Sequence, residues 1–503
     1  MKNKIKQKDL IIFLVLMILT CIIFEGYITK HYATDTYNII NIGYTNYAIN
    51  NSLIDGRIIA GGIEILADII NIPIQILVVS FTLIALFISC ITVIILKNMI
   101  IDMKKTDNKF LEIIAIIISY ITIFNFMYVE NLYFIEAMVM AISILMYILS
   151  VKEIIKKDKF YYIKALILAI IATFSYQGTI GLFIICGFVF IIIKNKENKK
   201  ENIKDLAILI SIVLISFIVN LIQIKITTQV LGIEQQRLGG ITNIALYTKH
   251  VLINFPTMIL KDIILNSCGL FPKTLLTLFI TLIIIIIMIN DIKNKEQNIS
   301  MKIIEILIVA VLITIAMCIV SLASYDTGRI HNQIGAIIGL MYIYIFCDSD
   351  IFTKDNIIKS KLIVILLVYS FITIVNTVVI LNQHKSVNKL EMEQCKKIEE
   401  YIERYEEENN TKITEAKYFK IYIKSNAFFS SIPNKSVITY NGVACTWSSI
   451  GTINFYTNRN FKNIKLDINE NKELFEEYLQ QKEKGYNNNF VIIDNVLYYT
   501  VFI

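Results

Sequence analysis

Acidic and arginine side chains gather in the stretch that follows the first long apolar run of the chain. Asp35 stands near the start of this stretch, and Asp55 and Arg57 follow further along with one glycine between them. A carboxylate can act as a general base that takes a proton from a hydroxyl group, and an arginine can hold a phosphate through two parallel hydrogen bonds. Transfer of a sugar from a lipid phosphate needs both functions. We therefore predict that Asp35 is the base, with Asp55 as the alternative, and that Arg57 binds the phosphate.

Arginine is rare in this chain, so the position of each arginine is informative. Among 48 lysines and arginines, the arginines are Arg57, Arg237, Arg329, Arg404 and Arg459. A chain that otherwise uses lysine keeps arginine where a planar, bidentate donor is needed for phosphate or carboxylate. We predict that Arg57 and Arg329 bind the donor phosphate and leave the role of Arg237 open. Chance placement of a small number of residues is the alternative.

Further polar side chains beside apolar runs are candidates for binding sugar hydroxyl groups. They are Glu130, Glu136, Tyr176, Gln177 and Asp326. A carboxylate inside an apolar helix, as expected for Glu136, is costly and marks a functional position. For Tyr176 and Gln177 a simple polar break between two short helices explains the residues equally well.

The acidic residues of the first polar stretch also have structural interpretations. Acidic side chains are common at helix starts and at turns, so Asp35 can be a helix N-cap and Asp55 a turn residue. Glu64 and Asp68 can form a solvated helix face. The spacing of Tyr37, Ile40, Tyr44 and Tyr47 predicts one helix that lies in the membrane interface, where tyrosine is favoured; all these residues lie in the first polar stretch.

The sequence indicates no metal and no cofactor, although it leaves a divalent metal open. The four histidines are far apart and form no pair such as His-x-x-x-His. The first polar stretch contains no Asp-x-Asp, and the eight cysteines have no metal-ligand spacing.

The elements that must position these residues are membrane helices. Hydrophobic residues make up 56% of the 503 residues and charged residues 18%, which lies outside the range of soluble domains. Apolar runs long enough to cross a bilayer occupy residues 10–28, 74–96, 274–290, 303–323 and 362–381. The net charge of +7 comes mostly from lysines in short loops, so it reports membrane topology and excludes nucleic acid as a partner.

Lysine clusters between the apolar runs predict the topology. They recur at residues 2–8, 97–109, 152–164, 194–204, 293–302 and 354–361. Lysine-rich loops stay in the cytoplasm, so an even number of crossings must separate successive clusters. Five hairpins and the last run give an all-α polytopic protein of the cell membrane with about eleven transmembrane helices and a cytoplasmic N-terminus. The segment 163–193 then holds two short or re-entrant helices.

The chain divides into two parts in this interpretation. Residues 1–381 form a transmembrane catalytic domain with outer loops 29–73 and 222–273, and residues 382–503 form a small α/β extracytoplasmic C-terminal domain. For this domain the pattern predicts a charged helix at 392–409, strands at 418–423 and 437–440, a helix near 470–482 and a hairpin at 490–502 that turns at Asp494 and Asn495.

These features resemble the type II glucosyltransferase family, the polytopic serotype-converting enzymes that glucosylate O-antigen or other surface glycans. The resemblance covers most of the chain and rests on Asp35 with Tyr37, Gly56-Arg57, Glu130-Asn131, Ser175-Tyr176-Gln177 and the loop of Arg329. It implies a C-type glycosyltransferase fold with an acidic catalytic residue in the first outer loop, which Asp35 matches. It also implies a polyprenyl-phosphate-linked glucose or related hexose as donor, a surface glycan as acceptor, and as partners a synthase that loads the lipid and a small flippase.

A transporter, such as a flippase for lipid-linked sugars, is the main alternative from another class. It would carry ionisable or helix-breaking groups near the bilayer midplane and an internal repeat, whereas the polar groups here cluster at outer helix ends. A membrane O-acyltransferase would need a histidine within a membrane helix, and only His331 comes near. A scaffold without activity gives no reason for Asp35, Asp55 and Arg57 to gather.

Overall fold

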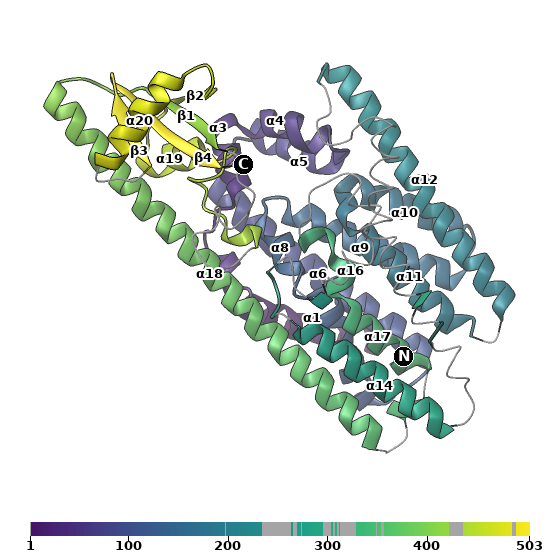
Figure 1. The fold of residues 1–503 in the computed structure, drawn as a ribbon. Helices are drawn as coiled ribbons and strands as arrows, with labels where there is room; N and C mark the ends of the chain where they lie inside the picture. The colour runs from purple at the N-terminus through teal and green to yellow at the C-terminus, as the bar shows by residue number, and fades with distance from the viewer. Residues whose placement is uncertain are drawn as a thin grey trace.

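The computed structural model covers the chain from end to end. It describes residues 2–196, 198–233, 263–264, 269–272, 274–294, 303–304, 307–308, 311, 328–348, 350–353, 357–421, 436–484 and 489–502. Helices dominate these residues, and one small sheet lies near the C-terminus (Figure 1).

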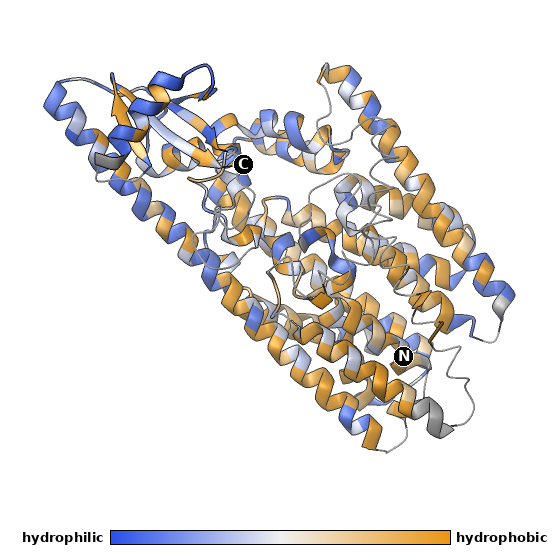
Figure 2. Ribbon diagram, viewed as in Figure 1, coloured by the Kyte–Doolittle hydropathy of each residue, from blue (hydrophilic) through white to orange (hydrophobic). Residues whose placement is uncertain are grey.

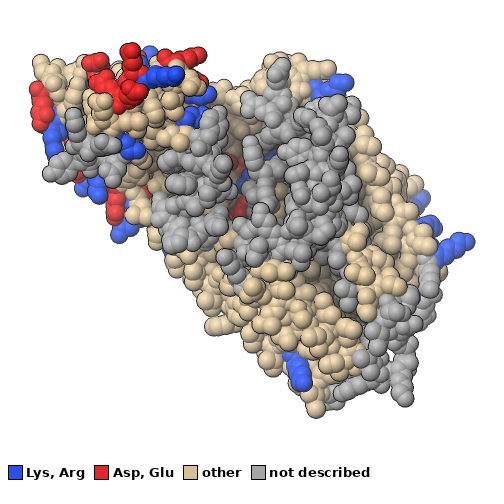
Figure 3. All heavy atoms as spheres, viewed as in Figure 1, with Lys and Arg blue, Asp and Glu red and all other residues tan. Residues whose placement is uncertain are grey.

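Five helical stretches of the described chain are long and apolar enough to cross a membrane. They are α6 (Ile74–Lys104), α9 (Ala137–Lys156), α10 with α11 (Tyr161–Lys194), α12 (Lys199–Leu231) and α18 (Ile357–Asn409). Apolar residues cover the helical body in Figure 2, and its surface in Figure 3 has few charged atoms, as a lipid-facing surface requires. The polytopic membrane character is thus supported, whereas the count of eleven crossings stays a prediction.

Other apolar helices are shorter or border residues outside the description. They are α1 (Lys2–Ile23), α7 (Lys109–Ile123), α14 (Leu275–Asn294) and α17 (Ile337–Asp348). The predicted run 303–323 lies mostly outside the described residues. Residues 222–231 of the predicted outer loop 222–273 are the last turns of α12, and most of the remainder of that loop is outside the described residues as well.

Helix α18 joins the two predicted parts of the chain without a break. It has 53 residues and continues through residue 381, where the last span was expected to end, into the charged stretch 392–409. No glycine or proline lies between its ends, so nothing in the backbone stops the helix. Figure 1 shows α18 running along the helical body with the sheet at its far end.

The predicted pair of short helices in segment 163–193 is confirmed. Helix α10 (Tyr161–Tyr176) and helix α11 (Ile180–Lys194) flank a 3-10 turn at Gln177–Thr179. The turn is held to α9, because the hydroxyl of Ser143 donates to the carbonyl of Tyr176 over 2.8 Å. Lys194 donates to the carbonyl of Ile155, so α11 ends beside the end of α9.

The predicted outer loop 29–73 folds into several short helices and not into the single interfacial helix that its tyrosines predicted. It contains α3 (Thr34–Ile42), α4 (Tyr44–Tyr47), a π-helical turn η1 (Ala48–Leu53) and α5 (Ile58–Ile69). Gly43 separates α3 from α4 with a φ of 83°, a left-handed conformation that glycine adopts without strain. Tyr37, Tyr44 and Tyr47 are buried against protein, so their spacing does not mark a membrane surface.

The C-terminal domain is a small α/β unit. Its sheet has the order β2-β1-β4-β3, with β1 (Glu415–Ile421) parallel to both β2 (Lys462–Leu466) and β4 (Val496–Phe502). Strand β3 (Phe490–Ile493) forms the predicted hairpin with β4. The domain also contains α19 (Ser449–Thr457) and α20 (Lys472–Lys484). The strand predicted at 437–440 is wrong, because Val437–Thr439 is a 3-10 turn whose start is capped by Ser436.

Candidate functional site

Asp35 lies in the first turn of α3, a helix that packs against α19 of the C-terminal domain. The N-cap of this helix is Ala33, so the N-cap interpretation of Asp35 is wrong. The start of α3 is fixed by two hydrogen bonds, one from the amide of Thr34 to the hydroxyl of Tyr133 and one from the amide of Ala33 to the hydroxyl of Thr36. These bonds satisfy amides that an isolated helix would leave open. The half-buried carboxylate of Asp35 is therefore held on a rigid element.

Tyr47 connects Asp35 to a second carboxylate. Its hydroxyl lies 3.2 Å from Oδ2 of Asp35 and 3.2 Å from Oε1 of Glu136, the residue that precedes α9. A tyrosine hydroxyl has one proton to donate, so the two carboxylates share a single donor. Burial raises the pKa of Glu136, and the charge of Asp35 raises it further.

Glu64 is a third carboxylate in this group. It is only 3% exposed, so its interpretation as part of a solvated face is wrong. The hydroxyl of Ser52, in the π-helical turn, donates to its Oε1 over 2.9 Å. Burial raises the pKa of Glu64 well above its usual value, and the charge of Glu136 adds to the shift.

Tyr176 brings the two predicted phosphate ligands together. The guanidinium carbon of Arg57 lies 5.0 Å from the centre of the Tyr176 ring, and Nε of Arg329 donates to the Tyr176 hydroxyl over 3.0 Å. The guanidinium of Arg329 also stacks on Phe134 at 3.9 Å. Two cations from segments far apart in sequence therefore flank one tyrosine.

Both arginines have carboxylate neighbours at distances too long for hydrogen bonds. Arg57 lies 3.6 Å from Asp55, and Arg329 lies 3.8 Å from Glu130. Nε of Arg57 and Nη1 of Arg329 are buried and have no hydrogen-bond partner within the described part of the chain. These groups can donate to an anion that approaches Tyr176.

The charges around the arginines keep them cationic. Burial acts to lower the pKa of Arg57 and of Arg329, but both pKa values are raised overall. For Arg57 the opposing charges come first from Asp55, and for Arg329 first from Tyr176 and then from Glu130. The charges of Arg57 and Arg329 also act on Glu136. The acids and the arginines thus form one electrostatic unit.

The backbone around Asp55 is built to present Arg57. The side-chain amide of Gln177 donates to the carbonyl of Asp55, and that of Asn220 donates to the carbonyl of Gly56 over 2.8 Å. Gly56 has a φ of 86°, and any side chain there would overlap Asn220. Asp55 thus ends a tight turn, as its structural interpretation predicted, and also pairs with Arg57.

The structure gathers eight of the nine predicted site residues around Tyr47 and Tyr176. They are Asp35, Asp55, Arg57, Glu130, Glu136, Tyr176, Gln177 and Arg329. Asp326 lies outside the described residues. In Figure 3 acidic and basic atoms are visible in a hollow between the C-terminal domain and α12.

The sequence does not reveal the positions of Tyr47 and Glu64 in this site. Both were assigned to solvent-facing or membrane-facing surfaces, and no spacing in the sequence shows that they point toward Asp35 and Glu136. Arg459, in contrast, binds Glu399 and Glu406 within the C-terminal domain and has a structural role there.

No three histidine, cysteine, aspartate or glutamate side chains converge in a metal-binding arrangement in the described part of the chain. Comparisons with protein-family models, with curated proteins and with solved structures each found no match. The residues and distances above are therefore the basis for assigning a function.

Proposed function

We propose that this chain is a membrane glycosyltransferase. It transfers glucose or a related hexose from a polyprenyl-phosphate donor to a hydroxyl group of a cell-surface glycan on the outer face of the membrane. The observation that carries the proposal is the pair of arginines at Tyr176. Nε of Arg57 and Nη1 of Arg329 are buried without an acceptor among the described residues, and both arginines lie in the same charge cluster as Asp35. A lipid phosphate supplies both the acceptors and the negative charge.

The chemistry divides between the two halves of the site. The acceptor hydroxyl attacks the anomeric carbon of the donor sugar, and its proton passes to Asp35. The bond from that carbon to the phosphate oxygen breaks, and its electron pair leaves with the polyprenyl phosphate. Arg57 and Arg329 stabilise the charge on this leaving group. Glu130, Glu136, Tyr176, Gln177 and Asp326 are the proposed ligands of the sugar.

Asp35 suits the role of base better than Asp55 does. The carboxylate of Asp55 is buried and faces Arg57, so its geometry serves to orient the arginine. Asp35 is half-buried, stands at the start of α3 and accepts a hydrogen bond from Tyr47. An acceptor hydroxyl can therefore reach Asp35 more readily than Asp55.

The orientation of α9 supports an outer location for the site. Glu136 precedes α9, whereas Lys156 and the neighbouring Lys194 lie at its other end. Twenty helical residues span about 30 Å, the thickness of the hydrocarbon core. With the lysines in the cytoplasm, the proposed topology of about eleven crossings puts the site and the C-terminal domain outside. A donor synthase and a small flippase would then supply the lipid-linked sugar.

The test is transfer of radiolabelled glucose from synthetic polyprenyl-phosphate-glucose to a cell-envelope glycan extract by purified protein in lipid. We expect transfer with the native chain, and its loss in Asp35→Asn, which removes the base without changing its shape. Asp68→Asn is the matched control, because Asp68 is exposed on α5 and contacts Thr45. If no lipid-phosphate hexose serves as donor, the proposal is wrong, and a lipid-scrambling assay then tests the flippase alternative.

A further inference from the structure

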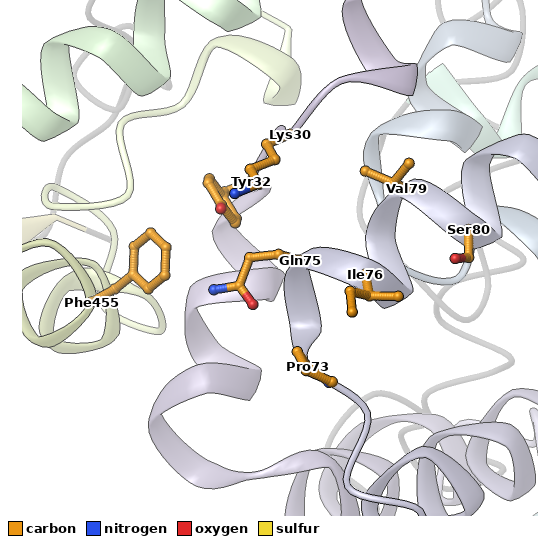
Figure 4. Close-up of a pocket in the computed structure, with 8 residues that line it drawn as sticks. All are labelled: Lys30, Tyr32, Pro73, Gln75, Ile76, Val79, Ser80 and Phe455. Atoms are coloured by element: carbon orange, nitrogen blue, oxygen red, sulfur yellow. The ribbon is translucent and has the colours of Figure 1, made fainter.

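A groove lies between the first outer loop, the start of α6 and the C-terminal domain. Its volume is about 660 Å³, and it is lined by Lys30, Tyr32, Pro73, Gln75, Ile76, Val79, Ser80 and Phe455. Figure 4 shows Tyr32 and Gln75 on one side of the opening and Phe455 of α19 facing them from the other. The rings of Tyr32 and Phe455 are 4.8 Å apart, so the two parts of the chain meet at this groove.

One wall of the groove belongs to a membrane-spanning surface. Ile76 and Val79 lie in the first turns of α6, which is long and apolar enough to cross a bilayer. Ile76 is 57% exposed, as expected for a side chain that faces lipid. The groove therefore opens where α6 enters the membrane, and a bound molecule can have one end in the hydrocarbon region.

The polar lining favours an anion. Lys30 is exposed, and no ion pair of Lys30 occurs within the described residues. The hydroxyl groups of Tyr32 and Ser80 and the side-chain amide of Gln75 can donate hydrogen bonds. Among the described residues that line the groove there is one lysine and no aspartate or glutamate, so they present a positive charge to a bound anion.

We propose that this groove binds the head group of an anionic phospholipid from the surrounding membrane. Its phosphate lies near Lys30 and Gln75, and an acyl chain follows Ile76 and Val79. Because Phe455 belongs to the C-terminal domain, the lipid bridges that domain to the helical body. The site is separate from the arginine pair at Tyr176 and does not depend on the proposed transfer reaction.

Native mass spectrometry of the full chain tests the proposal, with protein released from bilayers of phosphatidylglycerol mixed with phosphatidylcholine. We expect the native chain to retain phosphatidylglycerol in preference to phosphatidylcholine. Lys30→Gln should retain about fivefold less phosphatidylglycerol, which is the effect of one cation near an anionic membrane surface. Lys30→Arg should restore retention. Lys396→Gln is the matched control, because Lys396 is 77% exposed on α18 and lies outside the groove.

Three results would overturn the proposal. The first is equal retention of phosphatidylglycerol by the native chain and Lys30→Gln, the second is equal retention of the two lipids by the native chain, and the third is displacement of the lipid by inorganic phosphate. A melting temperature in pure phosphatidylcholine that is the same for both proteins shows that Lys30→Gln is folded. Millimolar inorganic phosphate should not displace the lipid; displacement would mean that the groove recognises phosphate alone, and the lipid assignment would be wrong.

Discussion

The hydroxyl of Tyr37 donates a hydrogen bond to the carboxylate of Glu391 over 2.8 Å, although 354 positions separate the two residues in the chain. The amide of Gly442 donates to the other carboxylate oxygen over 2.6 Å, and the side chain of Asn388 donates to the same oxygen as Tyr37. Glu391 therefore connects α3, α18 and the C-terminal domain. Because α3 carries Asp35, the C-terminal domain helps to fix the position of the proposed base.

Loss of this contact should loosen α3. We expect Tyr37→Phe to lower the free energy of unfolding by about 1–3 kcal/mol, because it removes one donor from a buried carboxylate. Amide hydrogen exchange in α3 should become faster, and the rate of the proposed sugar transfer should fall. Tyr161→Phe is the control, because it also removes a tyrosine hydroxyl but lies at the start of α10, far from α3.

Amide hydrogen exchange in α3 distinguishes a local loosening of this helix from a general destabilisation of the chain. If Tyr37→Phe destabilises the chain but leaves exchange in α3 unchanged relative to the rest of the protein, Glu391 does not position the helix. The packing of α19 against α3 provides a second test of whether the C-terminal domain positions α3, since a side chain at Gly451 would overlap the carbonyl oxygen of Tyr37. Gly451→Ala should therefore produce the same local loosening.

Local patterns in the sequence predicted those features that depend on near neighbours. The hairpin turned at Asp494 and Asn495 as predicted, and both have positive φ values of 48° and 62°. Such residues suit a tight turn because their short polar side chains tolerate the left-handed region. The polar break at Gln177 was likewise predictable, since polar residues interrupt an apolar run there. Charge and residue type also singled out Arg57 and Arg329.

Tertiary contacts decided the features that the sequence could not predict. Tyr37 and Tyr47 have the spacing of one helical face, but Gly43 turns the chain between them and sends their hydroxyls to different partners. Glu64 is of a residue type that is usually exposed, but it is buried, and Ser52 donates a hydrogen bond to its carboxylate. Neither outcome depends on sequence neighbours alone.

Arg329 should determine affinity for the lipid phosphate. Arg329→Lys keeps the charge but loses the planar donor set that contacts Tyr176. We expect the Kd for polyprenyl phosphate to rise roughly tenfold, which corresponds to the loss of about one charge-assisted hydrogen bond. Calorimetry in detergent measures this Kd. Arg459→Lys is the control: it disturbs the pairing with Glu399 and Glu406 and should leave the Kd unchanged. Equal Kd values for native and Arg329→Lys proteins would remove Arg329 from the phosphate site.

Glu64 should make stability depend on pH. Its pKa is raised by burial and by Glu136, so the folded chain holds its proton more tightly than the unfolded chain does. The stability that this bound proton contributes is fully present below the pKa that Glu64 has in the unfolded chain. It is lost as the pH rises through the pKa that Glu64 has in the folded chain, by at most about 1.4 kcal/mol per pH unit. We expect Glu64→Gln to raise the melting temperature more at pH 8 than at pH 5. Glu473→Gln, on α20, should give no such difference; a parallel shift at both pH values for Glu64→Gln would contradict the burial argument.

Tyr47 should set the pH dependence of transfer. Tyr47→Phe removes the hydroxyl that lies within hydrogen-bond distance of both Asp35 and Glu136, so the two carboxylates lose this shared donor. Without this donor the carboxylate of Glu136, whose pKa is raised by burial, should hold its proton more tightly, and the acid limb of the pH–activity profile should move to higher pH. Tyr44→Phe is the matched control, because the Tyr44 hydroxyl donates to the carbonyl of Ile72 and to neither carboxylate. A lower rate with an unmoved acid limb would mean that Tyr47 supports the loop without influencing the protonation of Glu136.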